Sequence, residues 1–132
     1  MPKNKSPKVL IIDDDLLLNR MYQLILQEAG YKVICALNGD EGLEKAVEAK
    51  PDLILLDIVI PGKDGIQVLE EIRRRKELKK VPVICLTVMD DKKVIQKCYS
   101  LGASDYIVKQ ETTPDQVVSK VVLRLNHSGH SL

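Results

Sequence analysis

The sequence predicts an α/β protein with a doubly wound, five-stranded parallel sheet and five helices. Short apolar runs alternate along the chain with longer segments in which apolar residues recur at helical spacing. The run Leu53–Leu56 ends on Asp57, and the proline and glycines that follow stop any regular element, as is typical of a strand buried on both faces. Each interval between apolar runs can hold a helix in a right-handed crossover, so we expect parallel strands.

The first strand is expected at residues 9–12, where four apolar residues stand in a row. A helix over about residues 15–29 follows, because its acidic start suits the helix dipole and Gly30 can cap its end. The apolar side chains at helical spacing, which we expect on its buried face, are Leu17, Met21, Leu24 and Ile25. The second strand is expected at residues 31–36.

The middle of the chain supplies two helices and the central strand. Asn38 and Glu41 have the spacing of a capping box, so the second helix is expected over residues 38–49. The strand at residues 53–57 comes next. A third helix over about residues 65–76 follows, since its apolar residues recur every three or four positions.

The last third of the chain repeats the alternation. A strand at residues 81–86 leads to Thr87, and a helix opened by Asp90 or Asp91 runs to about residue 101. A short strand at residues 106–108 is followed by Lys109. The segment Thr113–Gln116 combines a cap, a proline at the first helical position and a glutamine three residues after the cap, so the last helix begins there and ends near residue 126.

Composition restricts the class of protein. The chain has 132 residues, which suits one domain over residues 8–126 with short tails at residues 1–7 and 127–132. The formal net charge of +1 argues against nucleic acid or an anionic membrane as the main partner. No apolar run approaches the roughly 18 residues of a membrane span, and the first apolar run is too short for a signal peptide. We therefore expect a cytoplasmic protein.

Three minor features have simple interpretations. The three cysteines, Cys35, Cys85 and Cys98, are odd in number, lack metal-type spacing and are expected to be reduced packing residues. The basic residues between 73 and 80 could contact phosphates, but a solvated helix end explains them better because no aromatic residue is interleaved. His127 and His130 are too few for a tight metal site.

The polar residues that follow the predicted strands point to one site. Asp13 and Asp14 follow the first strand, Asp57 ends the third, Thr87 follows the fourth and Lys109 the fifth. Parallel strands bring these ends to one edge of the sheet, where such folds bind ligands. Clustered carboxylates require a cation, and hard oxygen ligands suit Mg²⁺. A carboxylate beside that ion can attack phosphorus to form an acyl phosphate, with the lysine and hydroxyl stabilising the phosphoryl oxygens.

Together these residues resemble the receiver domain of two-component response regulators over about residues 8–126. The motifs that carry the resemblance are Asp13 with Asp14, Asp57 with Pro61 and Gly65, and Thr87, Tyr106 and Lys109. The resemblance implies a flavodoxin-like sheet with strand order 2-1-3-4-5. It also implies that Mg²⁺ is the cofactor and that a histidine kinase or phosphotransfer protein supplies a phosphoryl group.

The resemblance also implies a role for each matching residue. Asp57 would be the phosphoacceptor, and the metal ligands would be Asp13, Asp14, Asp57 and the backbone carbonyl of Val59. The groups in contact with the phosphoryl would be Thr87, Lys109 and the backbone of Val88. Thr87 and Tyr106 would form the switch, and Val59 and Met89 would tune the lifetime of the phosphoryl group.

Three departures from the family pattern affect these roles. Gln110 replaces the proline that usually follows the lysine, so we expect a trans peptide bond or a locally strained loop at Lys109. Val88 replaces the small residue that usually follows the threonine and could crowd the phosphoryl site. Val59 and Met89 cannot orient a water by hydrogen bonding, so we expect slow autodephosphorylation.

The function expected is a phosphoacceptor signalling module and not an enzyme. Phosphorylation would switch the surface formed by the fourth helix, fifth strand and fifth helix, which binds a downstream partner or effector domain. That surface could also form a homodimer through Lys92, Lys93, Lys97 and Asp105. Two alternatives stay open at this point: a phosphorylation-independent adaptor, motivated by Gln110 and Val88, and an aspartyl-phosphate phosphatase, disfavoured by Val59.

Overall fold

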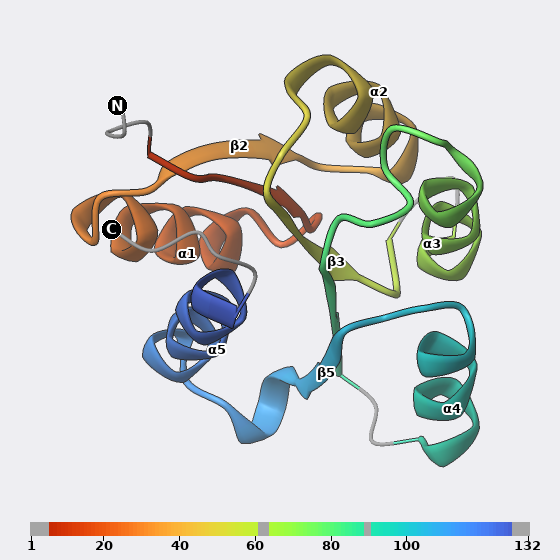
Figure 1. The fold of residues 1–132 in the computed structure, drawn as a ribbon. Coiled ribbons are helices and arrows are strands. Elements are labelled where there is room, and N and C mark those ends of the chain that lie inside the picture. The colour runs from red at the N-terminus through yellow and green to blue at the C-terminus, as the bar shows by residue number, and fades with distance from the viewer. Residues whose placement is uncertain (1–5, 61–63, 89–90, 128–132) are drawn as a thin grey trace.

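The computed structural model describes residues 6–60, 64–88 and 91–127, and Figure 1 shows a sheet between two layers of helices. The strands are β1 (Lys8–Ile12), β2 (Lys32–Ala36), β3 (Leu53–Asp57), β4 (Val83–Thr87) and β5 (Asp105–Val108). The helices are α1 (Leu16–Glu28), α2 (Gly39–Ala49), α3 (Gly65–Arg74), α4 (Lys92–Ser100) and α5 (Pro114–His127), and a 3₁₀ turn, η1 (Lys109–Glu111), follows β5.

All paired strands are parallel, in the order β2-β1-β3-β4-β5. This confirms the predicted doubly wound sheet and its strand order. Helices α1 and α5 cover one face, and α2, α3 and α4 cover the other (Figure 1). The central strand β3 is buried along its whole length, as its continuous apolar run predicts.

The alternation of side chains along the strands divides the core into two clusters. Leu10 and Ile54 pack in the cluster under α2, α3 and α4, whereas Val9 and Leu53 pack in the cluster under α1 and α5. Leu10 is also paired with Ile54 and Val9 with Leu53 across β1 and β3. Because a shift of one residue would exchange the two clusters, this pairing fixes the register of the sheet.

Helix caps bear out most of the predicted helix starts. The Asn38 side chain accepts the Glu41 backbone N–H at 2.8 Å, and the Thr113 hydroxyl accepts that of Gln116 at 3.3 Å. The Glu41 carboxylate accepts the backbone N–H of Leu37 at 2.7 Å, one residue before the expected partner. These contacts satisfy backbone donors that the first helical turn leaves without intrahelical partners.

Two element boundaries lie two residues from the predicted position, and smaller shifts occur at other ends. Helix α3 ends at Arg74 and not near residue 76, because Arg75 has extended backbone angles of φ −81° and ψ 129°. Strand β4 begins at Val83 and not at residue 81, because the Val81 N–H is used in a turn to the Leu78 carbonyl at 3.1 Å. The segment between α3 and β4 is therefore a hydrogen-bonded loop longer than the sequence suggested.

The predicted buried face of α1 is wrong for Leu17, Met21 and Leu24, whereas Ile25 packs against the core as expected. Leu17 is 71% exposed and Leu24 52% exposed, whereas the buried residues of the helix are Asn19, Tyr22 and Leu26. Helical spacing is satisfied by two apolar stripes in this segment, so periodicity alone could not choose between them. The Asn19 side-chain amide donates to the Asp13 carbonyl at 2.9 Å, and this buried bond fixes the rotation of the helix.

The three cysteines are free thiols, with Cys85 and Cys98 buried and Cys35 partly exposed, in agreement with their expected packing role. Among the described residues, no helix combines the length and the apolar character that a membrane crossing requires.

A matched pair of leucine substitutions tests the assignment of the α1 face. We expect Leu26→Ala to lower the free energy of unfolding by about 2–5 kcal/mol, because it empties a fully buried position. Leu24→Ala, the same change on the exposed stripe, should alter it by less than about 0.5 kcal/mol. Urea unfolding of both variants is the measurement, and a larger loss for Leu24→Ala would contradict the assignment.

Candidate functional site

The carboxyl ends of four strands converge at one edge of the sheet. Asp13 follows β1 directly, Asp57 and Thr87 are the last residues of β3 and β4, and Lys109 follows β5. The register confirms this alignment, because Asp57 is paired with Leu86 and Thr87 with Val108. Asp13, Asp57 and Thr87 are all buried. The structure therefore brings together the polar residues that the sequence placed at the strand ends.

Lys109 is the cation of the site. Its Nζ atom lies 2.9 Å from Asp13 Oδ2 and 3.0 Å from Asp57 Oδ2, and its side chain is nearly buried. The Lys109–Gln110 peptide bond is trans, which is one of the two outcomes expected from the replacement of proline. The turn is held by the Thr112 hydroxyl, which donates to the Val108 carbonyl at 2.9 Å, so Lys109 reaches the site without a proline.

Three carboxylates form a group suited to a divalent cation. Asp13, Asp14 and Asp57 each offer an oxygen, and these oxygens lie within 4.8 Å of one another. Asp13 Oδ2 is buried and accepts no hydrogen bond from the described residues, so its contact there is the ion pair with Lys109. One lysine cannot balance three carboxylates, and hard oxygen donors of this kind fit Mg²⁺.

Burial and charge act against each other at these groups. Burial raises the pKa of the Asp57 carboxyl to about 6, while Lys109 opposes the rise and Asp13 adds to it. For Lys109, burial alone would lower the pKa, but the ion pairs with the carboxylates of Asp13 and Asp57 outweigh it and leave the pKa raised. The buried cluster therefore carries an excess of negative charge near neutral pH.

Backbone contacts orient the Asp57 carboxylate. Its Oδ1 accepts the Val59 N–H at 3.0 Å, which leaves Oδ2 facing Lys109. The first residue of α3, Gly65, lies so close to this turn that an added Cβ would stand 2.5 Å from Ile58 Cα and 2.7 Å from the Asp57 carbonyl oxygen. Glycine at position 65 thus allows α3 to start directly against the end of β3.

The remaining predicted site residues have mixed positions. Tyr106 on β5 is paired with Cys85 in the neighbouring strand and packs against the cluster under α4. Val59 is 57% exposed and Val88 46% exposed, so both lie at the surface next to Asp57 and Thr87. Met89 and Pro61 lie outside the described residues.

Sequence reasoning missed two residues that support the site. Asn19 is buried and holds the Asp13 backbone by the bond described above. Tyr22 is also buried, and burial raises the pKa of its hydroxyl to about 12. The charge of Lys109 lowers this pKa and that of Asp13 raises it, so the hydroxyl interacts electrostatically with the site. Their common signal is a polar group in the second apolar stripe of α1, which contains Tyr22 and Leu26.

The protein is a doubly wound α/β domain. Its candidate phosphoryl site is the carboxylate cluster that Lys109 contacts at the carboxyl ends of the strands. Comparison with known families identifies it: the response regulator receiver domain family matches residues 9–122, and the chain belongs to this family. It is a receiver domain of two-component response regulators, and the phosphoacceptor role fits that family.

Individual relatives support this assignment. The chain is 36% identical over 131 residues to the transcriptional regulatory protein ResD of Bacillus subtilis (strain 168), covering 99% of the chain but 53% of ResD. It therefore spans about half the length of this relative. The structure is similar to the chemotaxis response regulator CheY4 of Vibrio cholerae, with a TM-score of 0.83, 30% identity and coverage of 92% and 99% of the two chains. It is also similar to the Mn(2+)-bound form of response regulator Rcp1, with a TM-score of 0.76, 27% identity and coverage of 90% and 91%.

The raised pKa of Asp57 predicts how stability depends on pH without metal. Folding raises this pKa from 3.8 to about 6, so the folded protein binds the proton more tightly than the unfolded chain. The stability contributed by this group is therefore present at low pH and is lost as pH rises through about 6. In EDTA at pH 8, we expect the free energy of unfolding of Asp57→Asn to exceed that of the native protein by about 1–3 kcal/mol. Near pH 4 this difference should disappear.

Urea unfolding between pH 4 and pH 8 measures this difference. Glu44→Gln, which removes an exposed carboxylate on α2, is the control and should show no comparable trend. An advantage of Asp57→Asn that is constant over this pH range would contradict the explanation.

Proposed function

We propose that Asp57 is the phosphoacceptor and receives its phosphoryl group from the phosphohistidine of a histidine kinase or phosphotransfer protein. The observation that carries this proposal is the buried Asp57 carboxylate, with Oδ2 3.0 Å from Lys109 Nζ and Oδ1 held by the Val59 N–H. A fixed carboxylate oxygen can attack phosphorus, and the lysine ammonium then stabilises the charge that develops on the phosphoryl oxygens.

The metal in this proposal is Mg²⁺. Its ligands would be the carboxylates of Asp13, Asp14 and Asp57 and the backbone carbonyl of Val59. When bound, the ion supplies positive charge that balances the clustered carboxylates and the incoming phosphoryl group. The similar response regulator Rcp1 has an Mn(2+)-bound form, which supports the binding of a divalent cation.

The phosphoryl group would also contact the Thr87 hydroxyl and the Val88 backbone N–H. Thr87 is buried at the end of β4, and Tyr106 lies on the neighbouring strand against the cluster under α4. A change at Thr87 can therefore reach the surface of α4, β5 and α5 through Tyr106. We propose that phosphorylation shifts the population of this surface toward the form that binds a downstream protein or effector domain.

Other features complete the proposal. Residues 8–126 form the receiver domain in the cytoplasm, flanked by tails, and the α4–β5–α5 surface is the place where a homodimer would form. The chain acts as a phosphoacceptor and not as an enzyme on a separate substrate. The adaptor alternative is not favoured, because the loop at Gln110 still brings Lys109 into the site.

We propose α1 as the docking surface for the phosphodonor. Its exposed apolar residues are Leu16, Leu17, Met21 and Leu24. Helix α1 begins three residues after Asp13, so this stripe borders the site. Exposed apolar surface of this extent marks an interaction site. In this proposal an apolar surface of the donor protein packs against this stripe.

Phosphorylation is tested by intact mass after incubation with a small acyl phosphate and Mg²⁺. The native protein should gain one phosphoryl group and Asp57→Asn none, because the amide cannot form an acyl phosphate. Glu44→Gln should be phosphorylated like the native protein. Absence of any gain in the native protein, with Mg²⁺ binding confirmed separately, would refute the proposal.

The lifetime of the phosphoryl group is expected to be long, because the valine at position 59 and the methionine at position 89 cannot orient an attacking water. The double substitution Val59→Asn with Met89→Glu should accelerate phosphoryl loss about tenfold by positioning that water. Decay of the phosphorylated mass with time measures the rate. An unchanged or slower rate would show that these two positions do not limit hydrolysis.

Donor docking is tested with any histidine kinase that phosphorylates the native protein. Leu17→Asp should slow transfer from the kinase about tenfold or more, since it puts a charge in an apolar interface, while phosphorylation by a small acyl phosphate stays unchanged. Leu123→Asp, the same change at an exposed residue late in α5, is the control. Equal effects of the two variants on kinase transfer would count against α1 as the docking surface.

A further inference from the structure

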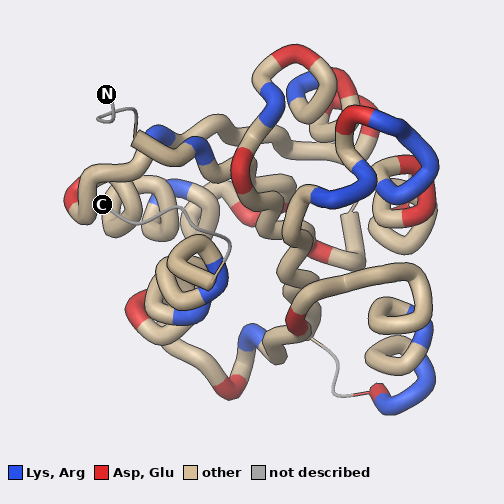
Figure 2. Tube along the Cα trace, viewed as in Figure 1, with Lys and Arg blue, Asp and Glu red and all other residues tan. Residues whose placement is uncertain are grey.

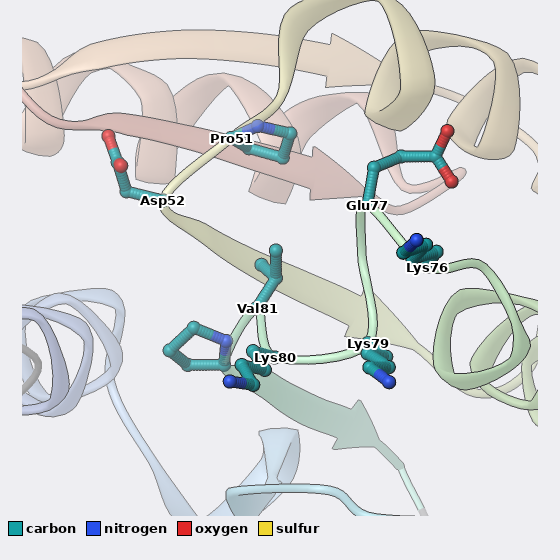
Figure 3. A pocket seen from close by; sticks show the side chains of 8 residues that line it. Pro51, Asp52, Lys76, Glu77, Lys79, Lys80 and Val81 are labelled. Atoms are coloured by element: carbon teal, nitrogen blue, oxygen red, sulfur yellow. The ribbon is translucent and has the colours of Figure 1, made fainter.

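A pocket of about 530 Å³ lies at the edge of the sheet opposite Asp57 (Figure 3). One wall is formed by Pro51 and Asp52, which precede β3, and the other by the loop between α3 and β4. That loop contributes Lys76, Lys79 and Lys80 together with Glu77, Val81 and Pro82, so three lysines stand against the two carboxylates of Asp52 and Glu77 in the lining. The pocket has a volume typical of small-molecule sites, and the receiver function does not use it.

Positive charge is concentrated beside this pocket. Residues 73–80 comprise three arginines, three lysines, one glutamate and one leucine, in a chain whose net charge is only +1. Figure 2 shows the stretch between α3 and β4 as Lys and Arg interrupted by one acidic residue. A helix dipole explains Arg73 and Arg74 in the last turn of α3, but Lys79 and Lys80 lie beyond the last turn, where that effect has faded.

The loop that presents these lysines is held in place. The Arg73 guanidinium donates to the carbonyls of Lys79 at 3.2 Å and Val81 at 2.8 Å, and the Leu78 side chain is fully buried. At the opposite wall, Asp52 Oδ2 accepts the Lys8 backbone N–H at 2.8 Å. Both walls are thus ordered before any ligand arrives, which lowers the entropic cost of binding.

The arrangement of side chains suits an anion with an apolar body. In Figure 3 Lys76, Lys79 and Lys80 lie along one wall, Val81 extends toward Pro51 on the other, and the carboxylates of Asp52 and Glu77 point outward. Ammonium groups on flexible stems bind phosphate as point charges and tolerate several ligand geometries. Val81 and Pro51 offer apolar surface for the organic body of the ligand.

We propose that this pocket binds a small organic polyphosphate, with the phosphates at Lys76, Lys79 and Lys80 and the organic body over Pro51 and Val81. A nucleic acid fits less well, because no aromatic side chain lines the pocket for base stacking. The concave shape also suits a small molecule better than an extended strand. This site is separate from the phosphoacceptor and does not depend on it.

The test is a titration of nitrogen-15-labelled protein in EDTA, followed by proton–nitrogen correlation spectra. Adenosine triphosphate and inorganic tripolyphosphate are the two probes. Saturable binding of both is expected, with shifts confined to amides around residues 76–81 and 52–53, and about fivefold tighter binding of adenosine triphosphate because its body covers apolar surface. EDTA keeps metal-bound phosphate away from Asp57.

Two triple variants decide whether the effect is specific. Lys76→Gln with Lys79→Gln and Lys80→Gln should weaken binding of adenosine triphosphate about tenfold or more. The control, Lys92→Gln with Lys93→Gln and Lys97→Gln, removes the same charge from exposed positions on α4 and should change it less than about twofold.

Three results would overturn the proposal. The first is general charge attraction. It would be indicated by binding that does not saturate at millimolar probe, or by an equal loss of affinity for adenosine triphosphate in both triple variants. The second is equal affinity for the two probes, which would remove the organic body from the site. The third is tighter binding of a single-stranded oligonucleotide than of adenosine triphosphate, with the same shifts, which would make the surface a nucleic-acid site.

Discussion

The contact of one lysine with two buried carboxylates is the interaction on which the site depends. Lys109 Nζ lies 2.9 Å from Asp13 and 3.0 Å from Asp57, and Asp14 adds a third carboxylate at the surface. Burial makes each unbalanced charge unfavourable, as the raised pKa of Asp57 shows. The protein therefore holds a negative cluster that is relieved when a divalent cation binds. In the proposed function the same cluster accepts a phosphoryl group, and its oxygens and its ammonium are fixed beforehand.

The sheet makes this cluster possible. Parallel strands place Asp13, Asp57 and Lys109 at one edge although they are far apart in the sequence. The connection after β3 then has to turn sharply, and Gly65 permits this because the backbone of Ile58 occupies the space of a Cβ. After β5, the Thr112 hydroxyl holds the turn at Lys109. Gln110 therefore does not displace the lysine.

Features that depend on strand order and on position at strand ends could be predicted from the sequence. Asp57 and Lys109 are such residues, since each stands at the end of a short apolar run that is typical of a strand. The rotation of α1 could not be predicted, because Leu17 and Leu24 on one stripe are as apolar as Leu26 on the other. The choice is made by a tertiary hydrogen bond from Asn19 to the Asp13 backbone, which leaves no periodic signal.

The carboxyl ends of the strands are mainly acidic, and the pocket at the opposite ends is mainly basic. This difference in charge would direct a phosphodonor and a free polyphosphate to different places. Carboxylates gather at the edge with Asp57, whereas at the other edge Lys76, Lys79 and Lys80 outnumber Asp52 and Glu77. A negatively charged phosphodonor is repelled by the acidic edge, so long-range attraction cannot guide it there. Short-range contacts must hold it instead, and the exposed apolar stripe of α1 lies where they are needed. A free polyphosphate lacks such contacts, so it is drawn to the basic edge and does not compete for Asp57 until a cation has neutralised the acidic one.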